Sequence, residues 1–254
     1  MNKKTVIANT VEYETIPITI PEDYMEYFDF VNLGAKNGGM EEYCRKTFGS
    51  QRGLHFEIND ECIETMESKN ISCIQADITN LTLPTKSVDF VISTHTIEHL
   101  PSLELVKKVI ELSINTAKDF VYLTWPWFDS DDYLKDLGLI PFPSTWDIHT
   151  CHVTISDLKN ILKELSLEGL FMAWPRIFSS EDDWILPIDY PKDMGELHNY
   201  KPEYGIKPIV NFELFQPVYR ESVCFIVLRD SQKTKNAIKN IQYCFRTVPW
   251  DIIE

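Results

Sequence analysis

The chain has 254 residues, of which 44% are hydrophobic and 25% charged, and this balance is ordinary for one large globular domain or a domain with an elaborated cap. Its formal net charge of -15 argues against general nucleic-acid binding, because phosphate backbones select basic surfaces. No stretch approaches about 18 uninterrupted apolar residues, and the first residues are polar, so we expect a cytoplasmic protein with no membrane partner. The six cysteines include no C-x-x-C pair, and we expect them to be reduced.

The first strong feature is an apolar run at residues 29–33 that stops at a turn carrying three glycines. Before it, residues 1–27 mix β-branched residues, prolines and tyrosines, which suits an extension packed over a domain edge. Glycine fits a backbone that turns with positive φ or approaches a ligand closely. We interpret the run as a first buried strand followed by a loop for a nucleotide-type cofactor. Lys36 stands where the G-x-G-x-x-G fingerprint has a second glycine, so an ordinary strand-to-helix turn is the alternative.

Helical and extended patterns alternate after this loop. Residues 40–48 have helical spacing and end at Gly49, a suitable C-cap, while residues 60–68 and 103–118 form two further helices. The expected strands cover residues 53–58, 72–77, 88–93 and 120–124. Such alternation predicts an α/β fold with a parallel, doubly wound sheet.

Two acids close expected strands. Glu57 lies 23 positions after Gly34, near the interval of about 20 residues at which nucleotide-binding βαβ units place a carboxylate on ribose hydroxyls. Asp77 ends the third strand, at the sheet edge where ligands bind. The alternatives are a surface carboxylate for Glu57 and a turn or N-cap residue for Asp77.

Four segments can be compared with known families: the loop at residues 31–39, Glu57, the triplet Gln-Ala-Asp at 75–77, and the fourth strand running into His-x-x-Glu-His-Leu at 95–100. Together they resemble the class I S-adenosylmethionine-dependent methyltransferases, clearly over residues 28–127 and loosely over 149–229. The resemblance implies a mostly parallel, seven-stranded Rossmann-like sheet whose last two strands, at residues 168–177 and 221–229, form an antiparallel hairpin.

The same resemblance implies S-adenosyl-L-methionine as cofactor and S-adenosyl-L-homocysteine as its product. The loop from residue 33 to 38 would hold the methionine part, Glu57 the ribose, and Asp77 with its neighbour the adenine. Thr94 and His95 would line the sulfonium side. The expected cofactor-binding residues are Asn32, Gly34, Ala35, Lys36, Gly38, Glu57, Ile58, Asp77, Ile78, Thr94 and His95.

Two of these residues depart from the family pattern. Asn32 replaces the acid usual in the first strand, and Lys36 replaces the middle glycine. Lys36 either neutralises the carboxylate of the cofactor or points to solvent. Glu98 and His99 begin the next helix, and we expect them to cap it.

The second half carries the expected substrate-binding parts. Residues 125–152 are rich in Trp, Pro and Phe and follow the fifth strand, so they suit a substrate loop, with a plain hydrophobic cap as the alternative. The insertion at residues 178–220 exceeds ordinary connections and favours a lid, or equally a homodimer contact. It interrupts a methyltransferase domain at residues 28–229. We expect the tail, residues 230–254, to pack as an amphipathic helix.

Three histidines are the candidate catalytic residues, namely His95, His149 and His152. A metal site needs a further ligand beside the His-x-x-His pair, and the stretch has no H-E-x-x-H motif, so we expect no metal. One histidine would instead serve as a general base, since imidazole titrates near neutrality, and Asp147 is a candidate to orient it. A purely structural role is the alternative for each ring.

These features predict methyl transfer to a hydroxyl of a small polar molecule, with sugars, sugar nucleotides or intermediates of surface-polysaccharide biosynthesis as the preferred acceptors. The alternative is a catalytically silent, methyltransferase-like cofactor-binding or scaffold protein, which the departures at Asn32 and Lys36 favour. A nicotinamide-dependent dehydrogenase would require the full three-glycine fingerprint, which is absent.

Overall fold

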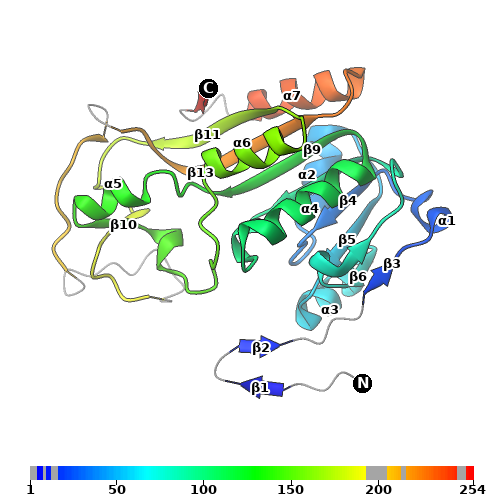
Figure 1. Cartoon of the computed structure of the whole chain (residues 1–254), viewed down its shortest axis with the longest axis horizontal. Coiled ribbons are helices and arrows are strands. Elements are labelled where there is room, and N and C mark those ends of the chain that lie inside the picture. Colours follow the sequence, from blue (N-terminus) through cyan, green and yellow to red (C-terminus); the bar gives the residue numbers. More distant parts are fainter. Residues whose placement is uncertain (1–4, 8–9, 13–16, 193–204, 213–215, 245–249) are drawn as a thin grey trace.

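A central eight-stranded sheet organises the chain in the computed structural model, which describes residues 5–7, 10–12, 17–192, 205–212, 216–244 and 250–254 (Figure 1). Its strands are β4 (Phe30–Leu33), β5 (Gly53–Glu57), β6 (Cys73–Gln75), β8 (Val88–Thr94), β9 (Ala117–Pro126), β11 (Gly169–Ile177), β13 (Val218–Val227) and β14 (Asp251–Ile252). They lie side by side in the order β14-β11-β13-β9-β8-β4-β5-β6.

Strand directions confirm the predicted fold class. β6, β5, β4, β8 and β9 pair in parallel, whereas β13 is antiparallel to both β9 and β11. β13 begins three residues earlier than predicted, because Val218 and Tyr219 continue the pairing with the end of β11. β14, contributed by the tail, adds an eighth strand that the sequence pattern did not predict.

Five main helices cover the sheet: α2 (Met40–Phe48), α3 (Asp60–Ser68), α4 (Leu103–Thr116), α6 (Ile155–Glu164) and α7 (Gln232–Cys244). Gly49 ends α2 in the left-handed conformation, with φ of 73°, and its N–H donates to the carbonyl of Cys44. A capping box of Thr154 and Asp157 starts α6. α4 ends two residues before its predicted end, because Ala117 already belongs to β9.

The sheet is buried on both faces. α4 and α6 cover one face, where they pack on residues such as Val31, Val91 and Leu123 (Figure 1). On the other face α2 and α7 cover a row of stacked phenylalanine rings from four neighbouring strands, with centroids 4.6 to 5.2 Å apart. The row consists of Phe30, Phe90, Phe120 and Phe225. α7 therefore packs as predicted for the tail, and Ala237 and Ile241 are buried.

A small lobe lies beyond the carboxyl end of β9, at the left of Figure 1. It contains α5 (Asp131–Asp136), β10 (Leu139–Pro141), the 3₁₀ turn η3 (Phe142–Thr145) and β12 (Ile185–Pro187). β10 pairs with β12, so the predicted substrate loop and the predicted insertion form one unit with its own apolar core. Residues 193–204 and 213–215 of that insertion lie outside the described residues.

The N-terminal segment contains β1 (Thr5–Ile7), β2 (Thr10–Glu12), β3 (Ile18–Thr19) and α1 (Glu22–Met25). β3 pairs in parallel with β7 (Leu81–Thr82), and Met25 is fully buried, so residues 17–27 pack against the domain. Two 3₁₀ turns, η1 (Ile78–Asn80) and η2 (Ile97–His99), follow β6 and β8.

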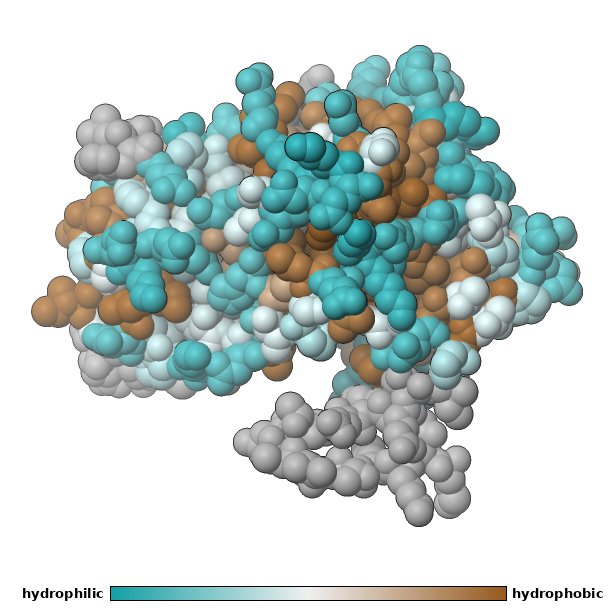
Figure 2. All heavy atoms as spheres, in the orientation of Figure 1, coloured by the Kyte–Doolittle hydropathy of each residue, from teal (hydrophilic) through white to brown (hydrophobic). Residues whose placement is uncertain are grey.

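The face that carries α4 and α6 is largely hydrophilic, with hydrophobic residues between the polar side chains (Figure 2). Lys107 of α4 pairs there with Glu164 of α6, with 2.7 Å between Nζ and Oε2. Within the described residues, no helix combines the length and apolar character needed to cross a membrane.

Candidate active site

The loop after β4 contains Gly34, Gly38 and Gly39, and Lys36 stands at the middle position of the G-x-G-x-x-G spacing. Gly34, Lys36 and Gly38 all have positive φ, of 77°, 49° and 73°. A Cβ on Gly34 would lie 2.3 Å from Thr96 Cγ2, and one on Gly38 would lie 2.7 Å from Ile71 Cδ1. Lys36 therefore occupies the left-handed conformation that favours a middle glycine. Its side chain is exposed.

Glu57 ties this loop to the end of β5. Its Oε2 accepts a 2.6 Å hydrogen bond from the Lys36 N–H, and its Oε1 accepts hydrogen bonds from the N–H groups of Ile58 and Asn59. A carboxylate offers about four acceptor positions, so one position stays open for a hydroxyl donor. The geometry is compatible with the predicted ribose contact, and it adds a structural role that the sequence pattern did not predict.

Asp77 acts as a cap for η1. Its Oδ1 accepts from the backbone and hydroxyl groups of Thr79, and its Oδ2 accepts from the amide of Asn80. This is the turn role named as the alternative for Asp77, and the adenine contact stays a prediction. The remaining predicted cofactor residues follow the strand ends: Ala35 and Ile78 are buried, Thr94 is half-buried at the end of β8, and Ile58 is exposed.

Asn32 lies beneath the loop and is fully buried. Its amide Nδ2 donates to His55 Nδ1 at 3.2 Å, and His55 Nε2 donates to Glu41 Oε2 at 2.9 Å. This chain of hydrogen bonds connects β4 and β5 to α2. Its place in the interior supports a positioning role for Asn32, and direct cofactor contact stays a prediction.

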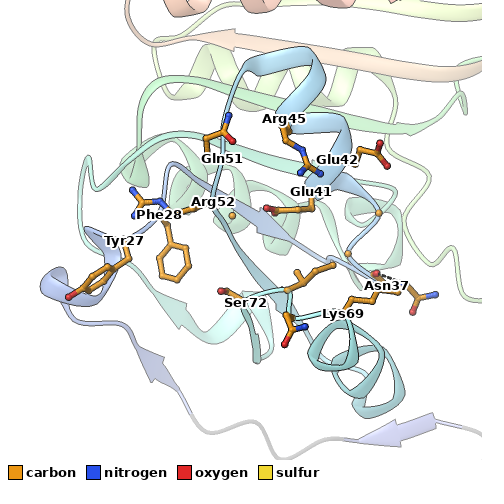
Figure 3. A pocket seen from close by; sticks show the side chains of 15 residues that line it. Tyr27, Phe28, Asn37, Glu41, Glu42, Arg45, Gln51, Arg52, Lys69 and Ser72 are labelled. Atoms are coloured by element: carbon orange, nitrogen blue, oxygen red, sulfur yellow. Dashed lines mark hydrogen bonds between the residues drawn. The ribbon is translucent and has the colours of Figure 1, made fainter.

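Figure 3 shows a groove on the α2 and α3 side of the loop, with a volume of about 680 Å³. Charged side chains line it, among them Glu41, Arg45, Arg52 and Lys69. Gly38 is the one predicted site residue among its 15 lining residues. The groove is therefore separate from the sheet edge that carries Glu57 and the residues after β8.

His95 follows β8 and lies between two carboxylates. Its Nδ1 is 3.5 Å from Glu98 Oε1, and its Nε2 is 3.5 Å from Glu221 Oε1 on β13. Burial opposes the charged ring, but the nearby carboxylates of Glu221 and Glu98 outweigh it and raise the pKa of His95 to about 10. His95 is thus protonated at neutral pH and cannot accept a proton there. No local pattern pointed to Glu221.

His149 is buried in the lobe, next to η2. Its Nδ1 donates to the carbonyl of Pro143 at 2.8 Å, and its ring contacts those of His99, Phe128 and Trp146. Burial lowers the pKa of His149, so the ring is neutral with its lone pair on Nε2.

Glu98 and His99 do not cap α4, contrary to prediction. Ser102 is the N-cap of that helix, and its hydroxyl accepts from the Leu105 N–H. Glu98 and His99 belong to the separate turn η2, where their ligand atoms lie within 4.8 Å of one another and of that of His149. The His-x-x-Glu-His motif showed Glu98 and His99 in the sequence, but the third member of the cluster, His149, lies some 50 residues further along the chain.

His152 is oriented by Asp131, not by Asp147. Its Nδ1 lies 2.9 Å from Asp131 Oδ2, which also accepts from the Ser144 hydroxyl, and its ring stacks on Phe128 with centroids 4.2 Å apart. Asp147 instead pairs with Lys192 at 3.1 Å. Nδ1 therefore carries a proton and Nε2 faces away from the carboxylate. In the sequence, only the run of acidic residues after β9 could have indicated Asp131 as this partner.

Comparison with known proteins agrees with the fold described above. Residues 31–111 match the family model described as "Methyltransferase domain". The structure of a SAM-dependent methyltransferase from Archaeoglobus fulgidus is 18% identical, with a TM-score of 0.54 over 81% of this chain and 90% of that chain. The YcgJ protein from Bacillus subtilis is 14% identical, with a TM-score of 0.51 over 83% of this chain and 98% of that chain. No curated protein matches the sequence.

Proposed function

We propose that this chain, a class I S-adenosylmethionine-dependent methyltransferase, methylates a hydroxyl oxygen of a small polar acceptor, with His152 as general base. S-adenosylmethionine is its cofactor. The observation that carries the proposal is the His152–Asp131 pair, which follows the carboxyl end of β9, the edge at which open α/β sheets bind ligands.

The loop at residues 34–38 and Glu57 would hold the cofactor, which supplies a methyl group already activated by a positive sulfur. As the acceptor oxygen bonds to the methyl carbon, the carbon–sulfur bond breaks and its electron pair remains on sulfur. His152 Nε2 takes the hydroxyl proton, and Asp131 stabilises the resulting imidazolium. The rest of the catalysis is alignment and exclusion of water.

The other two predicted histidines suit the base role less well. His95 is held as a cation by Glu98 and Glu221. His149 has a free Nε2, but it is buried among aromatic rings and lacks a carboxylate on its Nδ1. In His152 the carboxylate of Asp131 accepts from Nδ1 and orients the ring, which leaves Nε2 to face an acceptor.

We also propose an acceptor of the sugar, sugar-nucleotide or surface-glycan type. Support comes from the aromatic rings of this region: Phe128 stacks on His152, and the half-buried Trp146 and Trp184 of the lobe offer apolar faces to a polar, ring-bearing molecule. We further propose that the enzyme is cytoplasmic and that the lobe forms a homodimer contact.

An acceptor screen with methyl-labelled cofactor tests the proposal. We expect label in an ether of a hydroxyl-bearing acceptor, and His152→Gln should lower kcat by about 10²- to 10⁴-fold while the affinity for S-adenosylhomocysteine stays unchanged. Label on nitrogen, or full kcat in that variant, would contradict the proposed mechanism. Cofactor binding without transfer to any acceptor would support the catalytically silent alternative.

A further inference from the structure

We infer that Glu98, His99 and His149 form a binding site for one divalent transition-metal ion. The ligand atoms of the three side chains all lie within 4.8 Å of one another. A tetrahedral ion at 2.0–2.2 Å from each ligand requires separations of about 3.3 to 3.6 Å. The cluster must contract by about 1 Å, and the exposed His99 ring has the freedom to move. Of the His-x-x-His pair only His149 belongs to the cluster, and η2 provides the other two ligands.

Both rings already have the tautomer that a metal ligand needs. His99 Nδ1 is 3.1 Å from the carbonyl oxygen of Ile148, and His149 Nδ1 is 2.8 Å from that of Pro143. A carbonyl oxygen can only accept, so each Nδ1 carries the proton and each Nε2 keeps its lone pair. Histidines that bind metals commonly donate their other N–H in this way, which fixes the orientation of the ring.

Glu98 gives an independent observation. Its side chain is 0% exposed, and neither carboxylate oxygen accepts a hydrogen bond. Its ion-pair partner is His95, whose Nδ1 lies 3.5 Å from Oε1 and whose Nε2 lies 3.5 Å from Glu221. Glu98 thus shares this cation with a second carboxylate and has no hydrogen bond, which leaves its burial costly. A bound cation would supply that compensation.

The backbone holds the two segments of the cluster together. The Cys151 N–H donates to the carbonyl of Glu98 at 3.0 Å, and the Thr150 hydroxyl donates to the carbonyl of Leu100 at 3.0 Å. The site is therefore anchored on both sides before any ion binds.

Two imidazoles and one carboxylate favour Zn²⁺ or a neighbouring transition metal over Mg²⁺, and they leave a coordination position open. An acceptor oxygen would suit that position. This use of the ion rests on the proposed O-methylation, whereas the binding of the ion does not.

Calorimetric titration of the chelator-treated, full-length protein with ZnCl₂, without cofactor or acceptor, tests the site. We expect one ion per chain, and at least about 100-fold weaker binding in Glu98→Gln and in His149→Ala, because even indirect supporting residues change metal affinity by 10- to 100-fold. His152→Ala is the matched control: its ring pairs with Asp131 outside the cluster, so zinc affinity should not change.

A thermal scan separates lost binding from lost folding. Glu98→Gln without metal should melt close to the temperature of the metal-free wild type, because removal of a buried charge offsets loss of the ion pair with His95. Zinc should raise the melting temperature of the wild type and leave that of the variant unchanged. Unaltered zinc affinity in both ligand variants, or no wild-type binding tighter than about 0.1 mM, would overturn the site. Since no step needs methyl transfer, failure of the proposed function would leave these results unaffected.

Discussion

At the scale of single residues, the left-handed positions of the loop after β4 differ in which side chains they tolerate. Gly34 has no room for a Cβ, which would lie 2.3 Å from Thr96, whereas Lys36 already carries a side chain with φ of 49°. Gly34→Ala should reduce the free energy of unfolding by about 2 to 3 kcal/mol, through overlap and backbone strain. Lys36→Gly should change it by less than about 1 kcal/mol, because relief of strain offsets glycine's entropy. Urea unfolding measures both, and equal losses would contradict the packing of Gly34 on Thr96.

Glu57 has both a ligand role and a structural role in our account. Glu57→Ala should weaken S-adenosylhomocysteine binding by about 1 to 3 kcal/mol, because three backbone donors and the ribose lose their acceptor. Glu57→Gln, which keeps one acceptor oxygen, should lose less. Calorimetry on both variants measures the difference. Unchanged affinity in Glu57→Ala would remove the residue from the site.

At the scale of the element, Asp129 accepts hydrogen bonds from the first residue of α6. Its titration makes the stability of the protein depend on pH. Both of its oxygens accept from the Ile155 N–H, at 3.0 and 3.1 Å. Burial raises its pKa to about 6, with the charges of Asp157 and Asp131 adding to the effect. The folded state thus favours the protonated acid. The stability that this proton provides is complete below the unfolded pKa of about 4 and is lost as the pH rises through 6.

Asp129→Asn should therefore stabilise the protein at pH 8. The amide keeps an acceptor for the Ile155 N–H without the buried charge, and we expect a gain of about 1 to 2 kcal/mol after allowing for partial exposure. Denaturant unfolding across the pH range measures it. The gain should vanish below about pH 4, and a constant difference at every pH would refute the assignment of the charge.

Local sequence patterns predicted the elements well because each depends on nearby residues. The apolar run before Gly34 gave β4, and the helical spacing up to Gly49 gave α2. The site depends on distant contacts instead. Asp147 is closer to His152 in sequence than Asp131 is, yet Asp131 orients the ring because α5 starts directly after β9. The meeting of Glu98 with His149 and the pairing of β10 with β12 likewise become visible only in the fold.

At the scale of the whole molecule, Arg220 of β13 connects the sheet to the lobe. Arg220 of β13 donates to both oxygens of Asp182, at 3.0 and 3.1 Å, and its guanidinium lies 5.4 Å from the centre of the Trp184 ring. Arg220→Met should speed amide hydrogen exchange at residues 182–187 by about tenfold, as loss of roughly 1.4 kcal/mol from local stability would. Exchange in β4 and β8 should not change.

A matched control for that experiment lies at the other end of β13. Arg229 pairs with Asp119 at 2.7 Å, away from the lobe, so Arg229→Met should leave exchange at residues 182–187 as in the wild type. Equal effects of both substitutions would show that the lobe is not held by Arg220.

Cofactor choice is the most direct test of the whole account, since the loop, Glu57 and the sheet edge all depend on it. The measurement is calorimetric titration of the purified protein with S-adenosylhomocysteine, with NAD and NADP as controls. The account predicts micromolar binding of S-adenosylhomocysteine alone. Absence of that binding, or preference for a nicotinamide nucleotide, would contradict it.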